Sequence, residues 1–488
     1  MSTGPLPAGP YLVAGLGQAG AAAIGALRAA PACERLVAWD ASGAPGVHGG
    51  AGALRRRGVA VFVGGDGTDA LAAAGPRATV VKSPGLAPDA PLLRRAAGAG
   101  LPVWDELELG WRLRRHPTVG VTGTNGKSTT ARLIAAILGQ AGPPAGNFEF
   151  GPALCAAPPD GPLVVEVSSF QLDAAPSVLP QVAVLTNLTD EHLGWHGSRA
   201  AYAAAKRRLF LREDGRTAGT SVLNADDPFG RALARDVASA GGAVVTYGEA
   251  ADAHVRIAGA RWTAADARVV LARPEGTLEL RTQLPGAHNA RNVAAAAAAA
   301  CALGVPDAEL AAAAAATPRL PGRWERIDGG QPFDVLVDYA HTPDGVRAVL
   351  AAARAVVGPR PGARLRTVLG PVGLADPEKA AGIGRWAGAL SDDVVLTSGS
   401  APGSERILRL AELRRACDGG ARVTLRLDRR AAIAEAVGAA GPGDVVTVLG
   451  LGALGRMLLD RRGTRLAHDD REAARAALRA RGWDRWTS

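Results

Sequence analysis

The stretch that begins at residue 118 constrains the fold most strongly. A short β-branched strand leads into Thr122-Gly123-Thr124-Asn125-Gly126-Lys127-Ser128-Thr129-Thr130, and a helical pattern continues through Leu138. A glycine loop between a strand and a helix directs backbone amides at phosphate, with the lysine at its terminal oxygens and the serine available to Mg²⁺. A structural turn would not need the Gly-Lys-Ser run. The segment predicts a triphosphate-binding α/β domain, although its spacing is shorter than the GxxxxGK[ST] form.

Length and composition indicate a folded chain of several domains. The chain has 488 residues, 48% of them hydrophobic, which suits two to four domains with cores of their own. The alanine tract Ala294–Ala300 is too short for a membrane span, and the N-terminus MSTGPLPAGP lacks the segments of an export signal. We therefore expect a cytoplasmic protein without membrane insertion.

Cysteine spacing and charge exclude two further classes. The four cysteines lie far apart and form no CxxC pair, which argues against a structural zinc site or a disulfide framework. The formal net charge is +9, but the basic residues are interspersed with acidic ones, so no nucleic-acid partner is expected. The positive balance favours anionic small molecules instead.

Lysine is rare in this chain. It occurs only at Lys82, Lys127, Lys206 and Lys379, whereas arginine supplies the other 51 basic residues. Arginine is a permanently charged planar fork, but lysine is a compact ammonium that can lose its proton and act as a nucleophile. Each remaining lysine is therefore a candidate for chemistry that arginine cannot perform. For Lys82 and Lys379, chance retention explains the pattern equally well.

The N-terminal segment carries a glycine fingerprint. An apolar strand is followed by Gly15-Leu16-Gly17-Gln18-Ala19-Gly20 and an alanine-rich helix, and the next strand ends at Asp40, about twenty residues beyond the glycines. Such a fingerprint is weak evidence by itself. The turn could hold NAD, could hold the diphosphate of another nucleotide, or could be purely structural.

Polar residues follow two strands of the second segment. One apolar strand ends at Glu166, and the next runs into a polar stretch that includes His192. The carboxyl ends of parallel strands meet at one edge of a sheet, so a carboxylate and an imidazole there suit a divalent metal. The next helix, predicted over Arg199–Phe210, carries Lys206 among alanines, where burial lowers a lysine pKa and permits reaction with carbon dioxide.

The third segment alternates strands with helices, which is the pattern of a doubly wound α/β domain. A change of composition at Thr317–Arg323 indicates a linker before it. The chain is thus predicted to be α/β with three domains. Residues 1–116 form a Rossmann-like domain, residues 117–318 a central P-loop ATPase-type domain with a parallel sheet, and residues 319–488 a second Rossmann-like domain.

Seven motifs in this order resemble the ATP-dependent Mur ligases of peptidoglycan synthesis. They are GTNGKST at 123–129, EVSSFQL at 166–172, TNLTDEHLGWHG at 186–197, AYAAAK at 201–206, LNADDP at 223–228, LPGAHNARN at 284–292 and GRWE at 322–325. The motifs extend over essentially the whole chain, and their combination is specific although no single one would suffice. The resemblance implies an ADP-forming ligase that joins an acid to an amino acid.

In that family ATP phosphorylates the substrate carboxylate, and the incoming amine attacks the acyl phosphate. The resemblance implies catalytic roles for Lys127, His192 and Lys206, with a carbamylated Lys206. Two Mg²⁺ ions are implied, held by Ser128, Glu166, His192 and Lys206. The implied ATP contacts are Gly123, Thr124, Asn125, Gly126, Lys127, Ser128, Thr129, Asn289, Arg323 and Asp338.

The first domain resembles the branch of the family that adds glutamate to UDP-N-acetylmuramoyl-L-alanine. The fingerprint, the run VVKSPGLAPDAPLLRRAAGAGLPVWDELELGWRL at 80–113 and AGN at 145–147 carry this resemblance. It implies that the first domain holds the uridine diphosphate of the substrate rather than NAD, and that the two substrates are UDP-N-acetylmuramoyl-L-alanine and glutamate. We expect a monomer. The implied substrate contacts are Gly15, Gly17, Gln18, Asp40, Ser83, Asn147, Ser168 and Thr342.

The third domain departs from that branch. It has DYAHTPD at 338–344 and HDDREAARAAL at 468–478, which are similar to the branch that adds the third residue of the peptide. The stretch DNPR, with which that branch recognises diaminopimelate, is replaced by SGSAP at 398–402, so the arginine for a distal carboxylate is missing. D-glutamate is implied by default. L-glutamate, another amino acid, or a degenerate nucleotide-binding regulator are the open alternatives.

Overall fold

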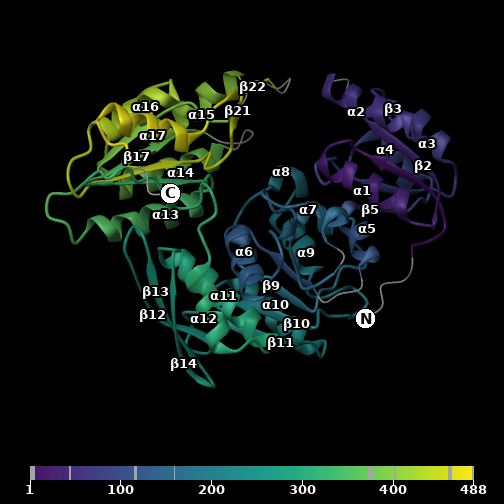
Figure 1. Ribbon diagram of the computed structural model, residues 1–488, viewed down its shortest axis with the longest axis horizontal. Helices are drawn as coiled ribbons and strands as arrows, with labels where there is room; N and C mark the ends of the chain where they lie inside the picture. Colours follow the sequence, from purple (N-terminus) through teal and green to yellow (C-terminus); the bar gives the residue numbers. More distant parts are fainter. Residues whose placement is uncertain are drawn as a thin grey trace. The chain divides into compact units, whose positions relative to one another are not determined.

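The computed structural model describes residues 6–42, 45–114, 118–158, 160–371, 377–400, 403–459 and 464–485. Within these ranges the chain forms α/β structure with parallel-rich sheets in three regions (Figure 1), which is the predicted fold class. It divides into two compact units, Met1–Arg256 with Ala295–Leu310, and Ile257–Ala294 with Ala311–Ser488. The domain boundaries at residues 116 and 318 stay predictions.

The first sheet has five parallel strands in the order β3-β2-β1-β4-β5. The strands are β1 (Gly9–Ala14), β2 (Cys33–Asp40), β3 (Ala60–Val63), β4 (Thr79–Lys82) and β5 (Val103–Asp105), and the helices are α1 (Gln18–Ala29), α2 (Pro45–Arg56), α3 (Thr68–Ala74), α4 (Pro91–Gly98) and α5 (Glu106–Leu113). Alternate residues of a strand face opposite sides of a sheet, so Val13 packs towards α1 and Leu12 towards α4. Both faces are covered, which explains the continuous apolar run of β1.

The second sheet contains parallel strands in the order β7-β8-β6-β9-β10-β11. The strands are β6 (Thr118–Thr122), β7 (Ala145–Gly146), β8 (Leu163–Glu166), β9 (Val182–Leu185), β10 (Thr220–Asn224) and β11 (Ala243–Gly248), and the helices are α6 (Lys127–Ile137), η1 (Leu154–Ala156), α7 (Ser169–Leu172), α8 (Leu193–His196), α9 (Arg199–Arg207) and α10 (Pro228–Ser239). The predicted end of α9 at Phe210 was wrong. The helix ends at Arg207 because the chain turns there and buries Leu209 and Phe210 in the core of this sheet.

Helix α5 ties the first sheet to the second through buried carboxylates. Glu106 accepts a hydrogen bond from the backbone amide of Cys155 in η1. Glu108 accepts hydrogen bonds from the amide and the hydroxyl of Ser177, at 2.9 and 2.5 Å. Both carboxylates lie in the first turn of α5, where the helix dipole favours negative charge.

We expect Glu106→Gln to stabilise the protein above neutral pH. Burial raises the pKa of Glu106 to about 7, so the folded chain binds more protons than the unfolded chain between the ordinary pKa and this value. The wild type therefore loses about 3 kcal/mol of stability from this group as the pH rises through that window, and the glutamine variant does not. Urea unfolding of both proteins at pH 5 and pH 8 measures the difference. A gap between the two proteins that does not widen towards pH 8 would contradict the assignment.

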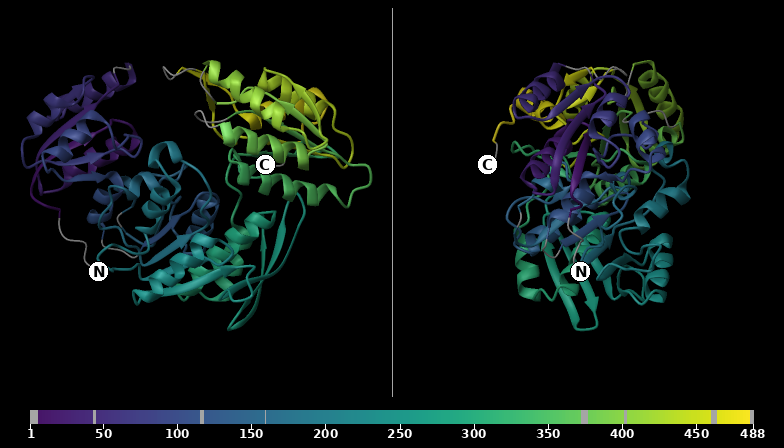
Figure 2. Two further views of the ribbon diagram at one scale, coloured as in Figure 1. Left: turned by 180° about the vertical axis from the view of Figure 1, so that it is seen from behind. Right: turned by 90° about the vertical axis from the view of Figure 1, so that its right-hand side faces the viewer.

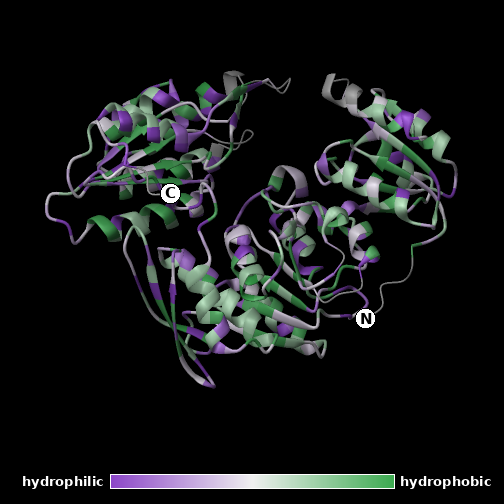
Figure 3. Ribbon diagram, viewed as in Figure 1, coloured by the Kyte–Doolittle hydropathy of each residue, from purple (hydrophilic) through white to green (hydrophobic). Residues whose placement is uncertain are grey.

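The alanine tract forms the buried middle of a helix. Helix α11 (Ala287–Ala302) has no exposed surface at any alanine from 294 to 300, and Figure 3 shows it as hydrophobic for most of its length. A helix that is apolar all round belongs inside a protein core. None of the helices in the described ranges is long and apolar enough to cross a membrane. The helix α12 (Asp307–Ala316) follows.

The second unit contains a three-stranded ribbon, whose last two strands pair antiparallel, and the third sheet. The ribbon consists of β12 (Val255–Trp262), which enters from the first unit, β13 (Ala267–Arg273) and β14 (Gly276–Thr282). The third sheet has the order β15-β16-β20-β17-β18-β19, parallel except for β15. Its strands are β15 (Glu325–Arg326), β16 (Asp334–Asp338), β17 (Leu365–Leu369), β18 (Asp393–Leu396), β19 (Arg422–Leu425) and β20 (Val445–Leu449).

Helices lie on both faces of the third sheet (Figure 2), as predicted for a doubly wound domain. The helices α13 (Pro343–Val357), α14 (Pro377–Leu390) and α15 (Gly403–Ala416) pack on one face, and α16 (Arg429–Gly438) and α17 (Asp470–Ala480) on the other. A short hairpin of β21 (Arg456–Leu458) and β22 (Arg465–Ala467) precedes α17.

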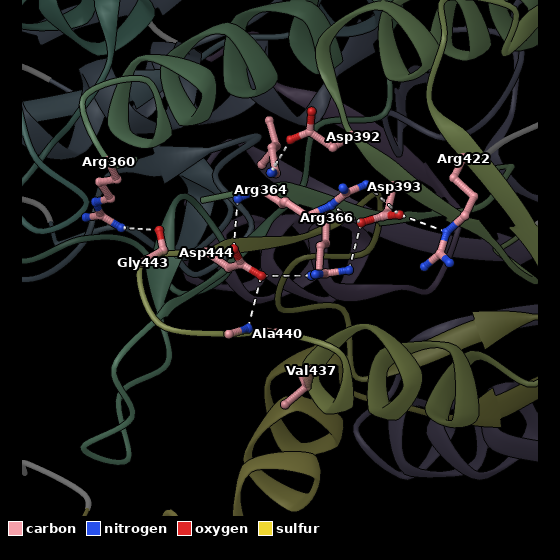
Figure 4. Close-up of polar contacts among 12 residues, drawn as sticks. Arg360, Arg364, Arg366, Asp392, Asp393, Arg422, Val437, Ala440, Gly443 and Asp444 are labelled. Atoms are coloured by element: carbon pink, nitrogen blue, oxygen red, sulfur yellow. Dashed lines mark hydrogen bonds and ion pairs between the residues drawn. The ribbon is translucent and has the colours of Figure 1, made fainter. Parts of the chain in front are cut away.

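Ion pairs close the amino edge of the third sheet (Figure 4). Asp393, at the start of β18, binds three guanidinium groups, those of Arg364, Arg366 and Arg422, at 2.7 to 3.2 Å. Asp444, just before β20, binds Arg366 at 3.0 Å. The amino ends of the strands are thus fixed by charge, which leaves the carboxyl edge for ligands.

Candidate functional site

The predicted nucleotide residues of the first domain meet at the carboxyl edge of the first sheet. The hydroxyl of Ser83, after β4, donates to the carbonyl of Gly15, after β1, at 3.3 Å. Asp40, at the end of β2, accepts hydrogen bonds from the amides of Leu16 and Ser42, at 2.7 and 2.8 Å. The strand order reverses between β1 and β4, and open α/β sheets bind ligands at such a position.

Helix α1 follows this turn, and its amino end lies at the same edge of the first sheet. Gly17 is the N-cap of α1, and a Cβ built there would meet nothing within 4 Å, so the space above the amide is open. Gln18 begins α1, and its side-chain amide donates to the carbonyl of Gly151 at 3.4 Å. An open helix N-terminus suits a diphosphate.

The phosphate loop between β6 and α6 has the geometry that its sequence predicts. Gly123 has φ +146°, and a Cβ there would lie 1.9 Å from the hydroxyl oxygen of Thr186, so only glycine fits. Gly126 caps α6 in the left-handed conformation, and Lys127 and Ser128 follow as its first residues. The ammonium of Lys127 lies 2.9 Å from the carbonyl of Thr124.

Residues after β9 hold this loop in place. Asn187 accepts a hydrogen bond from the amide of Asn125 at 2.9 Å and donates to its carbonyl at 3.0 Å. Thr186 donates to the same carbonyl at 2.7 Å. The hydroxyl of Thr124 accepts from the amide of Thr189 at 3.0 Å. The predicted ATP residue Asn125 is therefore engaged through its backbone, and these hydrogen bonds tie the loop to the residues after β9.

Ser128 and Glu166 lie together, as the metal prediction requires. The hydroxyl of Ser128 donates to one oxygen of Glu166 at 2.7 Å, and the side chain of Asn147 donates to the other at 3.1 Å. Ser168 forms a capping box with Gln171 at the start of α7, so its hydroxyl also has a structural use.

Lys206 is fully buried beside the phosphate loop. Its side chain is 2% exposed, its ammonium donates to the carbonyl of Gly123 at 2.8 Å, and it lies over the ring of Tyr202. Burial lowers the pKa of Lys206 well below its usual range, and the nearby charge of Lys127 lowers it further. A buried lysine that gives up its proton is available as a nucleophile.

His192 stands in a strained backbone conformation within an aromatic cluster. Its φ is 58°, uncommon for a residue with a side chain, and it is the N-cap of α8. Its ring packs edge-on against Phe170, with centroids 4.7 Å apart, and lies 6.1 Å from Tyr202. Such a strained backbone conformation persists where the surrounding packing holds it in place.

His196 is a residue of this cluster that the sequence reasoning missed. Its Nε2 lies 2.9 Å from the hydroxyl of Ser169, and its Nδ1 lies 3.6 Å from Asp173. Its ring stacks on Phe170, and burial lowers its pKa. It is the last residue of the short helix α8, whose N-cap is His192. The second histidine of the HLGWHG run was the available signal.

The remaining predicted contacts belong to the second unit. Asn289 donates to the carbonyl of Pro285 at 2.7 Å, and Thr342 is the N-cap of α13. Asp338 accepts hydrogen bonds from the amides of Trp324 and Ala340, both at 2.7 Å. The guanidinium of Arg323 lies over the ring of Tyr339, 4.2 Å from its centroid. The structure thus brings Arg323 and Asp338 to one end of β16.

The donor set suits magnesium. Among the described residues no group of three or more His, Cys, Asp or Glu side chains could hold a metal alone. Mg²⁺ that accompanies a nucleotide usually takes one or two protein oxygens, with phosphates and water as its other ligands. The adjacent oxygens of Ser128 and Glu166 match that requirement. Lys206 as an amine would not be a ligand, whereas its carbamate would supply anionic oxygens.

Two family models match the chain. That of the Mur ligase middle domain matches residues 159–300, and that of the Mur ligase glutamate ligase domain matches residues 322–452. A UDP-N-acetylmuramoyl-L-alanyl-D-glutamate--2,6-diaminopimelate ligase from Geobacillus kaustophilus is 34% identical over 399 residues, which are 75% of this chain and 79% of that protein. The chain belongs to the Mur ligases.

The other relatives of this Mur ligase include enzymes named for different steps. A UDP-N-acetylmuramoylalanine--D-glutamate ligase from Frankia casuarinae is 44% identical over 224 residues, which are 45% of this chain and 45% of that protein. The solved structure of a 2,6-diaminopimelate-adding ligase is 26% identical, with a TM-score of 0.55 over 85% of this chain and 89% of that one. The alanine ligase MurC from Thermotoga maritima shares the fold, with a TM-score of 0.60 over 97% and 99% of the two chains at 19% identity.

This Mur ligase is an ATP-dependent ligase that forms an amide bond in peptidoglycan precursor synthesis. The predicted family, fold class and enzyme class are confirmed. ATP and Mg²⁺ are the cofactors that Mur ligases use.

Proposed function

We propose that this Mur ligase adds glutamate to UDP-N-acetylmuramoyl-L-alanine. The carboxyl edge of the first sheet, formed by Gly15, Asp40 and Ser83, carries the proposal, since it suits the UDP end of this acceptor. The 44% identity to a relative named for D-glutamate addition supports it. D-glutamate is the default substrate, and L-glutamate is the alternative that the altered third domain leaves open. We further propose a cytoplasmic monomer.

In this proposal the first sheet holds the UDP moiety and the second sheet receives the muramyl-alanine end. Gly15, Gly17 and Gln18 present the turn and the amino end of α1 to the diphosphate, with Asp40 and Ser83 beside them. Asn147, His192 and Ser168 face the acceptor carboxylate. Thr342 is assigned to the incoming amino acid.

The phosphate loop then positions ATP for transfer of its terminal phosphoryl group to that carboxylate. Residues 123–129 cradle the phosphates through their amides, and Lys127 neutralises charge on the transferred group. Asn289 serves the adenine, Arg323 the phosphates and Asp338 the ribose. The glutamate amine attacks the resulting acyl phosphate, the amide bond forms, and phosphate leaves.

Lys206 is proposed to be carbamylated. Its neutral amine attacks carbon dioxide, a nitrogen–carbon bond forms, and one proton leaves, so a neutral buried amine becomes a buried anion. Ser128 and Glu166 would hold one Mg²⁺, and His192 with the Lys206 carbamate would hold a second. Bound there, the ions would neutralise negative charge on the phosphates and the acyl phosphate.

Phosphate release tests the proposed reaction. The purified protein is assayed with ATP, Mg²⁺ and UDP-N-acetylmuramoyl-L-alanine, in parallel with D-glutamate, L-glutamate, meso-diaminopimelate and no amino acid. We expect release that depends on glutamate. Release with L-glutamate alone would assign L-glutamate as the substrate. No phosphate release in any of the assays, despite ATP binding, would overturn the proposed reaction in favour of a regulator.

Addition of diaminopimelate is the second candidate. Several relatives named for that reaction match about three quarters of the chain, compared with 45% for the relative named for D-glutamate. Against it stands the sequence SGSAP at 398–402, which lacks the arginine for a distal carboxylate. This candidate needs UDP-N-acetylmuramoyl-L-alanyl-D-glutamate as acceptor, so a second set of assays with that acceptor separates the two.

A further inference from the structure

The strand order places a ligand crevice on the third sheet. Among the strands of the third sheet β20 comes last in sequence, but it lies between β16 and β17. The helices α13, α14 and α15 cover one face, and α16 returns the chain across the other. The direction of the chain thus reverses at β20, and open parallel sheets bind ligands at the carboxyl ends of strands where such a reversal occurs.

The loops at this edge approach each other closely. Gly399 follows β18, and a Cβ there would lie 2.0 Å from the carbonyl oxygen of Pro371, which follows β17. Glycine therefore allows the two loops to touch. The hydroxyl of Ser400 accepts a hydrogen bond from the amide of Leu458 at 3.0 Å, so the loop after β18 also contacts the hairpin of β21 and β22.

A single buried arginine joins these loops. Arg429, the first residue of α16, has a side chain that is 1% exposed. Its Nε and Nη2 donate to the two oxygens of Asp470 at 2.7 and 2.6 Å. Nη2 also donates to the carbonyl of Leu449 at 2.9 Å, and Nη1 donates to the carbonyl of Ser398 at 3.3 Å. One guanidinium thereby holds the end of β20, the loop after β18 and the start of α17.

His468 extends the network to the loop after β20. Its Nε2 lies 2.8 Å from an oxygen of Asp470, and its backbone amide donates to the carbonyl of Gly455 at 3.1 Å. Burial alone would raise the pKa of Asp470, but Arg429 and His468 outweigh it and hold that pKa below its usual range. Asp470 is therefore ionised, and its carboxylate pairs with the guanidinium of Arg429.

Stability is a weak reason for such a network. The desolvation cost of a buried ion pair often cancels its attraction, so the pair adds little compared with apolar packing. The amino edge of the same sheet already has its own ion pairs around Asp393. What distinguishes Arg429 is that two of its hydrogen bonds end on carbonyls of ligand-edge loops, which a planar fork can reach and a lysine cannot.

We propose that Arg429, Asp470 and His468 are positioning residues for the incoming amino acid. They touch no reacting atom. They fix the backbone after β18 and β20, so that these loops present their polar groups to the amino acid in one arrangement. The inference rests on the proposed function, because it takes the amino acid to bind at this edge.

Steady-state kinetics of Arg429→Lys test the role. We expect the KM for the amino acid to rise at least about tenfold, while the KM for ATP stays within about twofold, because misplacement of a site by a fraction of an ångström is costly. Arg366→Lys is the matched control, since it weakens a buried arginine–aspartate pair at the opposite edge of the same sheet. The control should keep the wild-type KM for the amino acid. Equal changes in both variants would overturn the proposal.

Two further measurements keep the test decisive. His468→Gln is the milder variant, and it should raise the same KM by a smaller factor. It carries the test if Arg429→Lys folds poorly. Hydrogen exchange without substrates should increase in residues 396–400 and 449–455 of Arg429→Lys but not of Arg366→Lys. Equal exchange in the two variants would overturn the positioning role. Turnover of the wild-type protein without any amino acid would overturn the proposed function instead.

Discussion

Replacing Lys206 by alanine is expected to lower kcat about 10³-fold with little change in the melting temperature. The side chain is buried beside Gly123 and Tyr202, where the carbamate would supply the anionic ligand of the second metal site. Loss of such charge stabilisation costs several kcal/mol in the transition state, which corresponds to a factor of this size. Initial rates of phosphate release at saturating substrates measure it.

A carboxylic acid should partly rescue this variant. Truncation to alanine leaves a cavity that propionate can enter, and its carboxylate would replace the lost anion. The wild type should in turn lose activity when carbon dioxide is removed and regain it with bicarbonate. Lys82→Arg is the control, because Lys82 is equally buried but pairs with Asp105 at 3.0 Å, so propionate should not affect it. Full activity of Lys206→Ala would contradict carbamylation of Lys206. So would the lack of a response of this variant to propionate and of the wild type to bicarbonate.

The central site was predictable because its residues follow strands of one parallel sheet. Once Lys127 and Glu166 are assigned to strand ends, topology brings them together, and the structure finds the hydroxyl of Ser128 against Glu166 as expected. The support for the loop was not predictable in the same way. Asn187 meets Asn125 across 62 residues of chain, and such pairing follows from strand order rather than from any local pattern.

The third domain shows where sequence patterns fail. The edge strand β19 and the helix α15 expose apolar residues such as Leu425 and Ile407, so the sequence there does not alternate cleanly between buried apolar and exposed polar positions. The network of Arg429 was also invisible, because its partners lie 20 to 41 residues away. Buried charges reveal their partners only once the fold is known.

Replacing Asp393 by alanine is expected to destabilise the protein by about 3 kcal/mol. The carboxylate is 8% exposed and serves Arg364, Arg366 and Arg422, so its loss leaves three guanidinium groups short of a partner (Figure 4). Removing one member of a buried pair costs 3 to 5 kcal/mol, and the lower end applies because two of these arginines are half-exposed or more. The transition that contains the third sheet should fall by roughly 6 to 12 °C in calorimetry.

The adjacent residue supplies the control for this prediction. Asp392 is one third exposed and binds Arg354 at 2.9 Å, so Asp392→Ala should cost only about 1 kcal/mol. The larger loss should also persist in 1 M salt, since a shielded carboxylate is screened much less than an exposed one. Equal losses in the two variants would mean that the amino edge is held by apolar packing rather than by charge. We expect a rigid amino edge to matter for turnover, because the loops proposed to position the amino acid leave the same strands at their other end.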